Sequence, residues 1–281
     1  MMALAIIGLV ATAIAWAGSD GGVMLGSLPL MAVVVVMVFV IQWLAFIPAY
    51  KYQTERFYDL TGSLTYIAAT LLALVGASVY DLRSALLATF IIIWAVRLGS
   101  FLFVRISQDG RDSRFDKIKP SPTLFFRTWS LQGLWVAVTA GAALAAITSA
   151  ESVALSVMDS FGIALWVFGF GMEVIADRQK RLFRQVQGPE KFITSGLWSR
   201  SRHPNYFGEI TLWLGIAVLA MPALQGWQIV TLVSPVFVYL LLTRVSGVAM
   251  LEHISDRRWG EDPEYVAYKA NTPVLVPRLL R

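Results

Sequence analysis

Long apolar runs constrain this chain more than any other feature of its sequence. Of its 281 residues, 57% are hydrophobic and only 15% are charged. A soluble domain of this length could not bury so much apolar surface. A helix needs about 20 apolar residues to cross a bilayer, so we predict an all-α, polytopic transmembrane helix bundle. The seven expected spans lie at about residues 28–49, 62–80, 82–104, 129–147, 154–175, 206–219 and 227–249.

The N-terminal apolar run, residues 3–17, is short and has no basic residue before it. It is either a short eighth span or an apolar segment similar to the core of a signal peptide, and the missing basic region argues against cleavage. We therefore treat residues 1–20 as an uncertain segment and residues 21–281 as a single transmembrane domain. The chain has no cysteine, which excludes disulfides and thiolate metal sites.

Loop charge predicts the orientation. Residues 105–127 and 177–203 are rich in Arg and Lys, whereas the connection between these regions carries no Arg or Lys and only the acids Glu151 and Asp159, with Glu173 near its end. By the positive-inside rule, both basic loops, residues 51–60 and the C-terminal tail face the cytoplasm. These polar segments could form a cytosolic pocket. The net charge of +5 therefore indicates topology and anion binding rather than affinity for nucleic acid.

A basic stretch from Arg200 to Ile210 runs directly into an apolar segment. Proline is favoured in the first turn of a helix, so a helix is expected to begin at Pro204. Its free N–H groups, together with Arg202 and His203, suit an anion such as a phosphate. The same pattern is also typical of a basic loop facing lipid headgroups, and the residues alone leave both interpretations open.

Several ionisable residues lie within or beside the apolar runs, where a charge is costly unless it faces a cavity or a partner. Arg97 could pair with Glu173 or Glu55, and Arg244 with Glu209, in purely structural ion pairs. The excess of cations on this face favours an anionic ligand. The four-residue spacing of Glu173 and Asp177 could mark a metal site, but no further ligand has matching spacing, so we expect no metal. The ionisable residues within or beside the apolar runs are Glu55, Asp59, Arg97, Glu173, Asp177, Glu209 and Arg244.

The polar tail is expected to contain a helix that begins at Asp262-Pro263-Glu264. Tyr265, Tyr268 and Lys269 then share roughly one face. That face either lies on the membrane surface or caps the pocket, with its rings on a flat ligand. No G-x-G-x-x-G follows a strand and no G-x-S-x-G occurs, which argues against a Rossmann domain and a serine hydrolase.

Five separated motifs resemble the membrane steroid 5-alpha-reductase family, more narrowly a bacterial branch catalogued as a domain of unknown function. The resemblance covers roughly residues 40–281. The motifs are Arg202-His203-Pro204-Asn205-Tyr206-x-Gly208-Glu209 with Trp213 and Gly215; Glu173-x-x-x-Asp177-x-Gln179; Asp59-Leu60-Thr61-Gly62-Ser63-Leu64-Thr65-Tyr66; Trp94-x-x-Arg97-Leu98-Gly99; and Tyr265-x-x-Tyr268-Lys269 with Pro277-Arg278.

This resemblance implies a seven-helix bundle that binds NADPH in a cavity open to the cytosol and reduces the Δ4 double bond of a 3-oxo steroid. It places Asn205 on the nicotinamide carboxamide, Glu209 nearby, and Asp177 close to the cofactor, and it puts Arg202 and His203 toward phosphate. Arginine forks suit phosphate groups. The remaining expected cofactor residues are Arg97, Arg105, Arg178, Lys191, Tyr206, Arg244, Tyr268 and Lys269.

In the same family, a Gln–Glu pair and a tyrosine line the substrate end of the pocket. Here Gln53-Thr54-Glu55 is similar, with one extra residue between the pair. Glu55, buried and protonated, is expected to donate a hydrogen bond to the enone oxygen, with Gln53 assisting. The family tyrosine aligns near Trp94, so the expected substitute is Tyr66, which follows Glu55 by eleven residues and so lies near the same helix face. Tyr66 is equally consistent with a simple interfacial aromatic residue.

Two other functions remain open from the sequence. The core of the basic signature is also similar to that of isoprenylcysteine carboxyl methyltransferases, which use S-adenosylmethionine. A non-enzymatic lipid-binding or transport bundle is the third possibility. For the reductase we expect a lipophilic, steroid-like enone as substrate, membrane lipid and no nucleic acid as partners, a monomer, and a place in the bacterial inner membrane.

Overall fold

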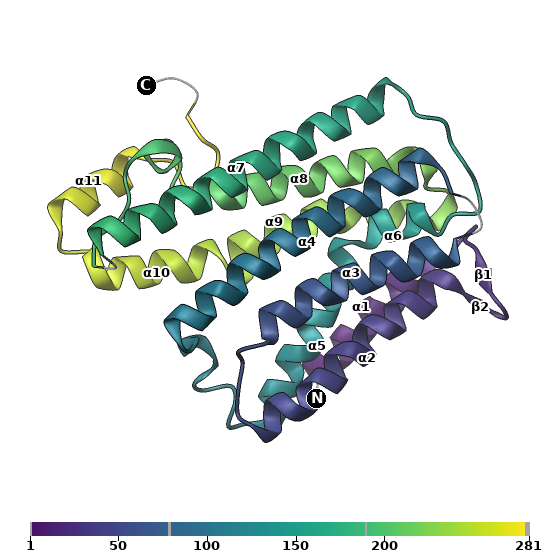
Figure 1. Ribbon diagram of the computed structural model, residues 1–281, viewed down its shortest axis with the longest axis horizontal. Coiled ribbons are helices and arrows are strands. Elements are labelled where there is room, and N and C mark those ends of the chain that lie inside the picture. The colour runs from purple at the N-terminus through teal and green to yellow at the C-terminus, as the bar shows by residue number, and fades with distance from the viewer. Residues whose placement is uncertain (1, 78–79, 189, 279–281) are drawn as a thin grey trace. The chain divides into compact units, whose positions relative to one another are not determined.

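The computed structural model describes residues 2–77, 80–188 and 190–278, and it is almost entirely helical (Figure 1). The predicted all-α, polytopic class is confirmed. The chain divides into two compact units. Unit 1 comprises Met1–Asp159 and Ile216–Ser234, and unit 2 comprises Ser160–Gly215 and Pro235–Arg281. The expectation of one domain over residues 21–281 stays a prediction.

In unit 1, α3 and α4 lie side by side, and α2 packs against both α3 and α5 (Figure 1). A two-stranded antiparallel hairpin precedes α2. Its elements are α1 (Met2–Gly18), β1 (Met24–Leu25), β2 (Leu28–Pro29), α2 (Leu30–Lys51), α3 (Tyr58–Gly76), α4 (Leu82–Asp109), the 3₁₀ turn η1 (Ser113–Phe115), α5 (Pro122–Thr139), α6 (Gly141–Ile147), η3 (Met221–Ala223) and η4 (Gly226–Val233).

Unit 2 holds most of the C-terminal half, and three of its helices, α7, α8 and α9, also have residues in unit 1. After α9 the chain forms a short π-helix before α10 begins. The elements are α7 (Val157–Gln187), η2 (Gly196–Ser199), α8 (Pro204–Ala220), α9 (Ser234–Leu240), the π-helix η5 (Leu241–Val245), α10 (Val248–Trp259) and α11 (Pro263–Asn271).

Six of the described helices are long and apolar enough to cross a membrane, and the bent pair α5–α6 makes a seventh if it counts as one span. This protein is therefore an integral membrane protein. The apolar α1 has only 17 residues, fewer than the roughly 20 that a straight span needs. The expected span at residues 62–80 includes positions 78 and 79, which lie outside the described residues.

Three expected spans have different limits in the structure. The span at 129–147 begins already at Pro122 and bends by 56° between α5 and α6. The helix expected at 154–175 is α7, which continues to Gln187. Its last turns are polar, so the length of the apolar run did not indicate where the helix ends. The span at 227–249 is a succession of 3₁₀, α and π segments rather than one α-helix.

The predicted starts of two helices are confirmed. α8 begins at Pro204, and α11 begins at Pro263 with Asp262 as its N-cap, whose carboxylate accepts a hydrogen bond of 2.8 Å from the Glu264 N–H. Proline costs no hydrogen bond at these positions, because the first-turn N–H groups have no partner within the helix.

A buried ion pair in unit 1 joins the first turns of α4 and α7. Arg83 and Asp159 form this pair, and each side chain is 1% exposed. The Arg83 guanidinium also donates to the carbonyls of Leu219 at 2.8 Å and Ala154 at 3.0 Å. The pair therefore ties the start of α4 to the segment before α7 and to the end of α8. Removing one partner of such a pair typically costs about 3–5 kcal/mol of stability.

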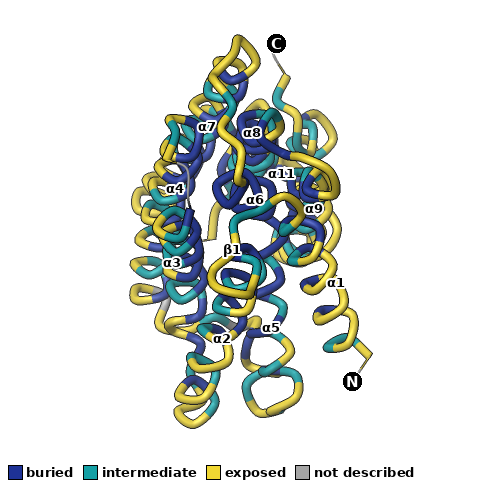
Figure 2. Tube along the Cα trace, turned by 90° about the vertical axis from the view of Figure 1, so that its right-hand side faces the viewer, coloured by how far each residue is buried: buried dark blue, intermediate teal, exposed yellow. Residues whose placement is uncertain are grey.

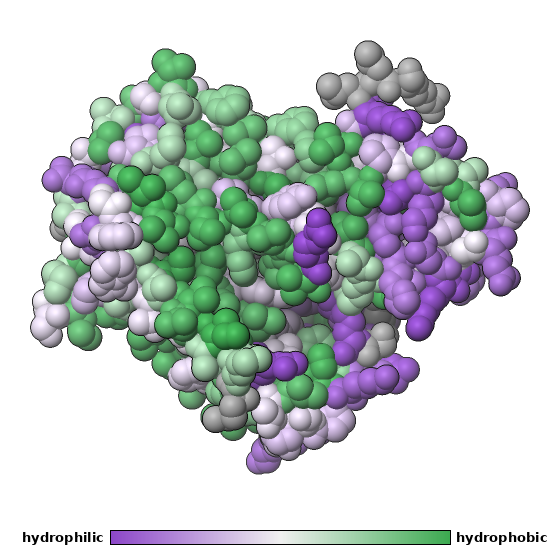
Figure 3. Space-filling view, turned by 180° about the vertical axis from the view of Figure 1, so that it is seen from behind, coloured by the Kyte–Doolittle hydropathy of each residue, from purple (hydrophilic) through white to green (hydrophobic). Residues whose placement is uncertain are grey.

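The burial pattern fits helices immersed in lipid. Figure 2 shows α6 buried along its length, whereas α1 and the outer faces of α3 and α4 are largely exposed. Figure 3 shows apolar side chains over much of the visible face and hydrophilic ones gathered over the α10–α11 region. Lipid covers exposed apolar helix surface in a membrane protein, so these faces need no protein partner.

Candidate functional site

The start of α8 is the centre of the candidate site in unit 2, and close helix packing positions it. A Cβ atom placed on Gly208 would lie 2.6 Å from the Gly169 carbonyl oxygen and 2.7 Å from the Glu173 backbone nitrogen. Such a contact is tolerated only by glycine. The first turn of α8 therefore lies directly against α7, beside the buried Glu173 and Asp177.

Asn205 joins these two helices at the site. Its Nδ2 donates to Asp177 Oδ1 at 3.2 Å. Its Oδ1 is buried and accepts no hydrogen bond from any residue that the structure describes. Because a buried carbonyl oxygen without a donor is costly, this atom is suited to accept a hydrogen bond from a ligand. Glu209 follows one turn later in α8 and is half-buried.

The two side chains expected to face phosphate are engaged with Glu252 of α10. Arg202 Nε and Nη2 lie 3.2 Å and 3.0 Å from the Glu252 carboxylate, and Nη1 donates to the carbonyls of Lys269 and Thr272. His203 Nε2 lies 2.9 Å from the same carboxylate. Arg202 thus attaches the C-terminal segment to the start of α8 through acceptors that no local sequence pattern reveals, and its expected contact with phosphate stays a prediction.

His203 is buried, and its ring is stacked on Tyr206 with a centroid distance of 5.6 Å. Burial lowers the pKa of His203, and this effect outweighs the raising influence of the Glu252 carboxylate. The imidazole is therefore neutral at pH 7 and is a hydrogen-bonding group rather than a phosphate-binding cation.

The aromatic residues of the tail are packed inward. The Tyr268 hydroxyl donates to the Trp198 carbonyl at 2.7 Å, and burial raises the Tyr268 pKa. Tyr265 is buried, and its hydroxyl donates to Asp256 at 3.0 Å. The Phe192 ring packs edge-on against Tyr265 at 5.3 Å. Tyr265 is therefore held between α10 and Phe192, and the expectation that the tail rings stack on a flat ligand stays a prediction.

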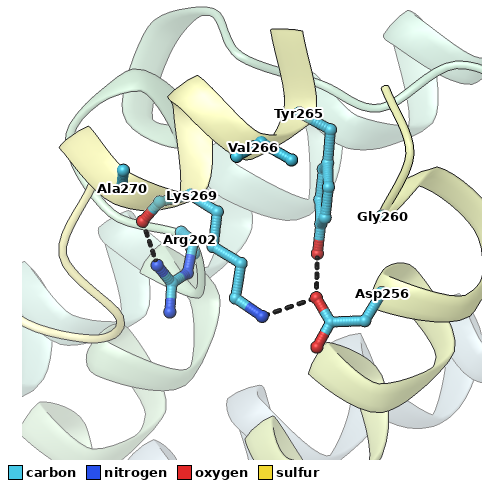
Figure 4. Close-up of a pocket in the computed structure, with 7 residues that line it drawn as sticks. All are labelled: Arg202, Asp256, Gly260, Tyr265, Val266, Lys269 and Ala270. Carbon is cyan, nitrogen blue, oxygen red and sulfur yellow. Dashed lines mark hydrogen bonds and ion pairs between the residues drawn. The ribbon is translucent and has the colours of Figure 1, made fainter. Parts of the chain in front are cut away.

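A pocket of about 530 Å³ lies between α10 and α11 (Figure 4). Its polar end combines the Arg202 guanidinium with Lys269, whose ammonium is paired with Asp256 and lies 3.5 Å from Glu252. A second pocket, of about 340 Å³, includes Lys191 in its lining. The first pocket is lined by Arg202, Asp256, Gly260, Tyr265, Val266, Lys269 and Ala270.

Other expected cofactor residues of unit 2 are on its surface. Arg178, Lys191 and Arg244 are exposed. Lys191 Nζ lies 3.3 Å from Gln187 Oε1. Among the residues that the structure describes, neither Arg178 nor Arg244 forms an ion pair, so the alternative in which Arg244 pairs with Glu209 is not found. Arg244 lies in the π-helix η5, and the apolar periodicity of the sequence did not indicate a π-helix there.

The expected catalytic residues belong to unit 1, and the structure corrects the role of Glu55. Its buried carboxylate forms an ion pair with Lys119 and accepts a hydrogen bond of 2.8 Å from the Asp112 N–H. Burial acts to raise the Glu55 pKa, but these hydrogen bonds outweigh it and hold the pKa below its ordinary value. Glu55 is therefore ionised at neutral pH and is not the protonated donor that we expected. It also pairs with Lys119 rather than Arg97.

Gln53 does not assist Glu55. It is exposed, its φ of 50° ends α2 in the left-handed region, and its Nε2 donates to the Tyr50 carbonyl at 2.8 Å. The Thr54 N–H reaches the Ala49 carbonyl at 3.0 Å, which completes the usual hydrogen-bonded end of a helix. Gln53 thus has a structural position at the α2 terminus.

Tyr66 lies beside Trp94 in unit 1. The rings meet edge to face at a centroid distance of 5.1 Å, and the Tyr66 hydroxyl donates to the Trp135 carbonyl at 3.4 Å. α3 begins only at Tyr58, so the shared helix face expected for Glu55 and Tyr66 does not exist. Arg105 lies 3.7 Å from Asp59, and the Arg97 guanidinium lies 5.3 Å from the Phe101 ring centroid.

The sequence comparisons add a family to this geometry. Residues 45–272 match the family described as "Protein of unknown function (DUF1295)". The chain belongs to the DUF1295 family. The DUF1295 region contains every site residue discussed above, whereas α1 lies outside it. No curated protein and no solved structure matches this chain.

Proposed function

We propose that this DUF1295 protein is an NADPH-dependent reductase of the bacterial inner membrane, with its cofactor site toward the cytoplasm. Its substrate would be a 3-oxo-Δ4 steroid or a similar lipophilic enone. The bound cofactor would supply a hydride to the β carbon of the enone double bond, and a proton would follow at the α carbon. The proposal rests on the motif resemblance and on one structural observation, the unpartnered Oδ1 of Asn205.

Asn205 has the chemistry that a carboxamide ligand requires. Asp177 holds the Nδ2 group at 3.2 Å and thereby fixes the orientation of the amide. The buried Oδ1 is then left as an acceptor for an N–H donor, such as the amide nitrogen of nicotinamide. His203, which is neutral, directly precedes Pro204 and Asn205. Tyr206, whose ring is stacked on that of His203, directly follows them.

Surface charge in unit 2 supports a phosphate-bearing ligand. Arg178 and Arg244 are exposed and carry guanidinium groups that no described carboxylate neutralises. Guanidinium groups suit the phosphates of a dinucleotide, including a 2′-phosphate. The adenosyl group of S-adenosylmethionine carries no phosphate and would need no such charge.

The test is equilibrium binding of NADPH and of S-adenosylmethionine to the purified protein, followed by NADPH oxidation with and without progesterone. We expect NADPH to bind, and its oxidation to depend on the enone. Asn205→Leu should weaken NADPH binding about tenfold or more, because a buried amide hydrogen bond is lost. Binding of S-adenosylmethionine alone would establish the methyltransferase, and binding of neither cofactor would contradict both enzymes.

Asn271→Leu is the matched control for this substitution. Asn271 is exposed in α11, and its Nδ2 donates to the Ala267 carbonyl at 2.8 Å. This variant should bind NADPH like the wild type. Equal losses of affinity in both variants would show that Asn205 has no specific contact with the cofactor.

A further inference from the structure

Two glutamines lie in the interior of unit 1, within helices that are apolar enough to span the membrane. Gln42 of α2 is 0% exposed, and Gln132 of α5 is 6% exposed. Gln42 Nε2 donates to Thr65 Oγ1 at 2.9 Å, and Thr65 in turn donates to the Thr61 carbonyl at 2.7 Å. Within residues 2–77, 80–188 and 190–278, no group donates to the Oε1 atom of either glutamine.

Gly62 and Thr65 place the two amides on one face of α3. A Cβ atom on Gly62 would lie 2.7 Å from Gln132 Nε2, so the absence of a side chain at Gly62 makes room for this amide. Gln42 bonds to Thr65, three residues further along α3. Residues three apart share a helix face and are separated by a rise of about 4.5 Å. The side-chain amides of Gln42 and Gln132, which carry the two unpartnered oxygens, therefore lie next to each other on this face of α3.

Both amides lie near the middle of their helices, where the bilayer offers no bulk water. Buried carbonyl oxygens in such a place are normally bonded to protein or to an ordered molecule. A single O–H group lies about 2.8 Å from its acceptor, and a buried water molecule typically makes about three hydrogen bonds. The two Oε1 atoms are therefore suited to accept hydrogen bonds from a small donor.

We propose that α2, α3 and α5 enclose a binding site for a hydroxyl donor, formed by the side-chain carbonyls of Gln42 and Gln132. The donor is either an internal water molecule or the hydroxyl group of a lipid-soluble alcohol. This site belongs to unit 1, whereas Asn205 belongs to unit 2, and the proposal does not depend on the proposed reductase activity.

The test is Gln132→Met, which keeps the shape of the side chain and removes its polar atoms. If the site holds a donor, the substitution lowers the midpoint of thermal unfolding in detergent by about 3 °C or more, because a bonded carbonyl is lost. If the site is dry, methionine removes an unsatisfied buried oxygen, and the midpoint is unchanged or rises. Either of these last results overturns the proposal.

Gln228→Met is the matched control. Gln228 is also 0% exposed in unit 1, but its Nε2 donates to Gly18 and Ala145 carbonyls at 3.2 and 3.4 Å, and its Oε1 accepts from the Gln225 N–H at 3.0 Å. Gln228→Met should therefore lower the midpoint whether or not the proposed site holds a donor. This decrease shows that the assay detects the loss of a hydrogen-bonded buried amide.

Solvent extraction of the purified protein distinguishes the two sources. A hydroxylated lipid recovered at about one molecule per chain by mass spectrometry identifies an alcohol, and its absence identifies water. Should Gln132→Met fail to fold, an experimental density map of the wild type decides. A peak within hydrogen-bond distance of either Oε1 supports the site, and empty density at both oxygens overturns it.

Discussion

At the scale of single residues, Glu252 explains why Arg202 and His203 are turned toward the protein. Its carboxylate lies within 3.2 Å of Arg202 and within 2.9 Å of His203, and Lys269 lies 3.5 Å away. A sequence motif rich in cations is therefore partly a device for attaching the tail to α8. The acceptor that remains for a ligand is the amide of Asn205, the least conspicuous polar group of the motif.

His203 should make stability depend on pH. Its charged neighbours are Glu252, which raises its pKa, and Lys180 and Arg202, which lower it, while burial is the largest influence and lowers it. The stabilising contribution is complete above the ordinary value near pH 6.5 and is lost as the pH falls from there through the folded-state pKa. The free energy of unfolding should fall with a slope of at most about 1.4 kcal/mol per pH unit.

The measurement is chemical unfolding in detergent between pH 5 and pH 8. His203→Gln should flatten the decline below pH 6.5, whereas His253→Gln, at an exposed position, should leave the decline in place. An unchanged decline in His203→Gln would assign it to other groups.

At the scale of elements, glycines spaced by seven residues hold α7 and α8 together within unit 2. Gly208 faces Gly169, and a Cβ atom on Gly215 would lie 2.7 Å from both the Gly162 carbonyl oxygen and the Trp166 backbone nitrogen. Backbones approach this closely only where side chains are absent. The glycines of the signature thus position Asn205 against Asp177.

Gly208→Ala should separate these helices and lower the free energy of unfolding by about 1–3 kcal/mol, because the new methyl group meets backbone atoms. Gly171→Ala is the control in α7, since a Cβ atom there meets nothing within 4 Å. It should stabilise the helix by about 0.5–1 kcal/mol. Titration with a denaturing detergent measures both variants, and equal effects would contradict close packing at Gly208.

At the scale of the whole molecule, the chain lacks cysteine, so single introduced cysteines report its membrane topology directly. Glu151 and Glu261 are both exposed. With the basic loops inside, Glu151→Cys should react with a membrane-impermeant maleimide in intact cells, and Glu261→Cys only after permeabilisation. The reverse pattern would place the tail and the start of α8 outside and would exclude a cytosolic cofactor for this site.

The sequence by itself determined the properties that depend on neighbouring residues. Apolar length gave the membrane-spanning helices, and proline at a first turn gave the starts of α8 and α11. Only the tertiary structure decided the partners of the buried charges. Arg202 meets Glu252 across 50 residues, Lys119 meets Glu55 across 64, and Arg83 meets Asp159 across 76. No local periodicity encodes such distances, because the pairing depends on which helix faces become buried together.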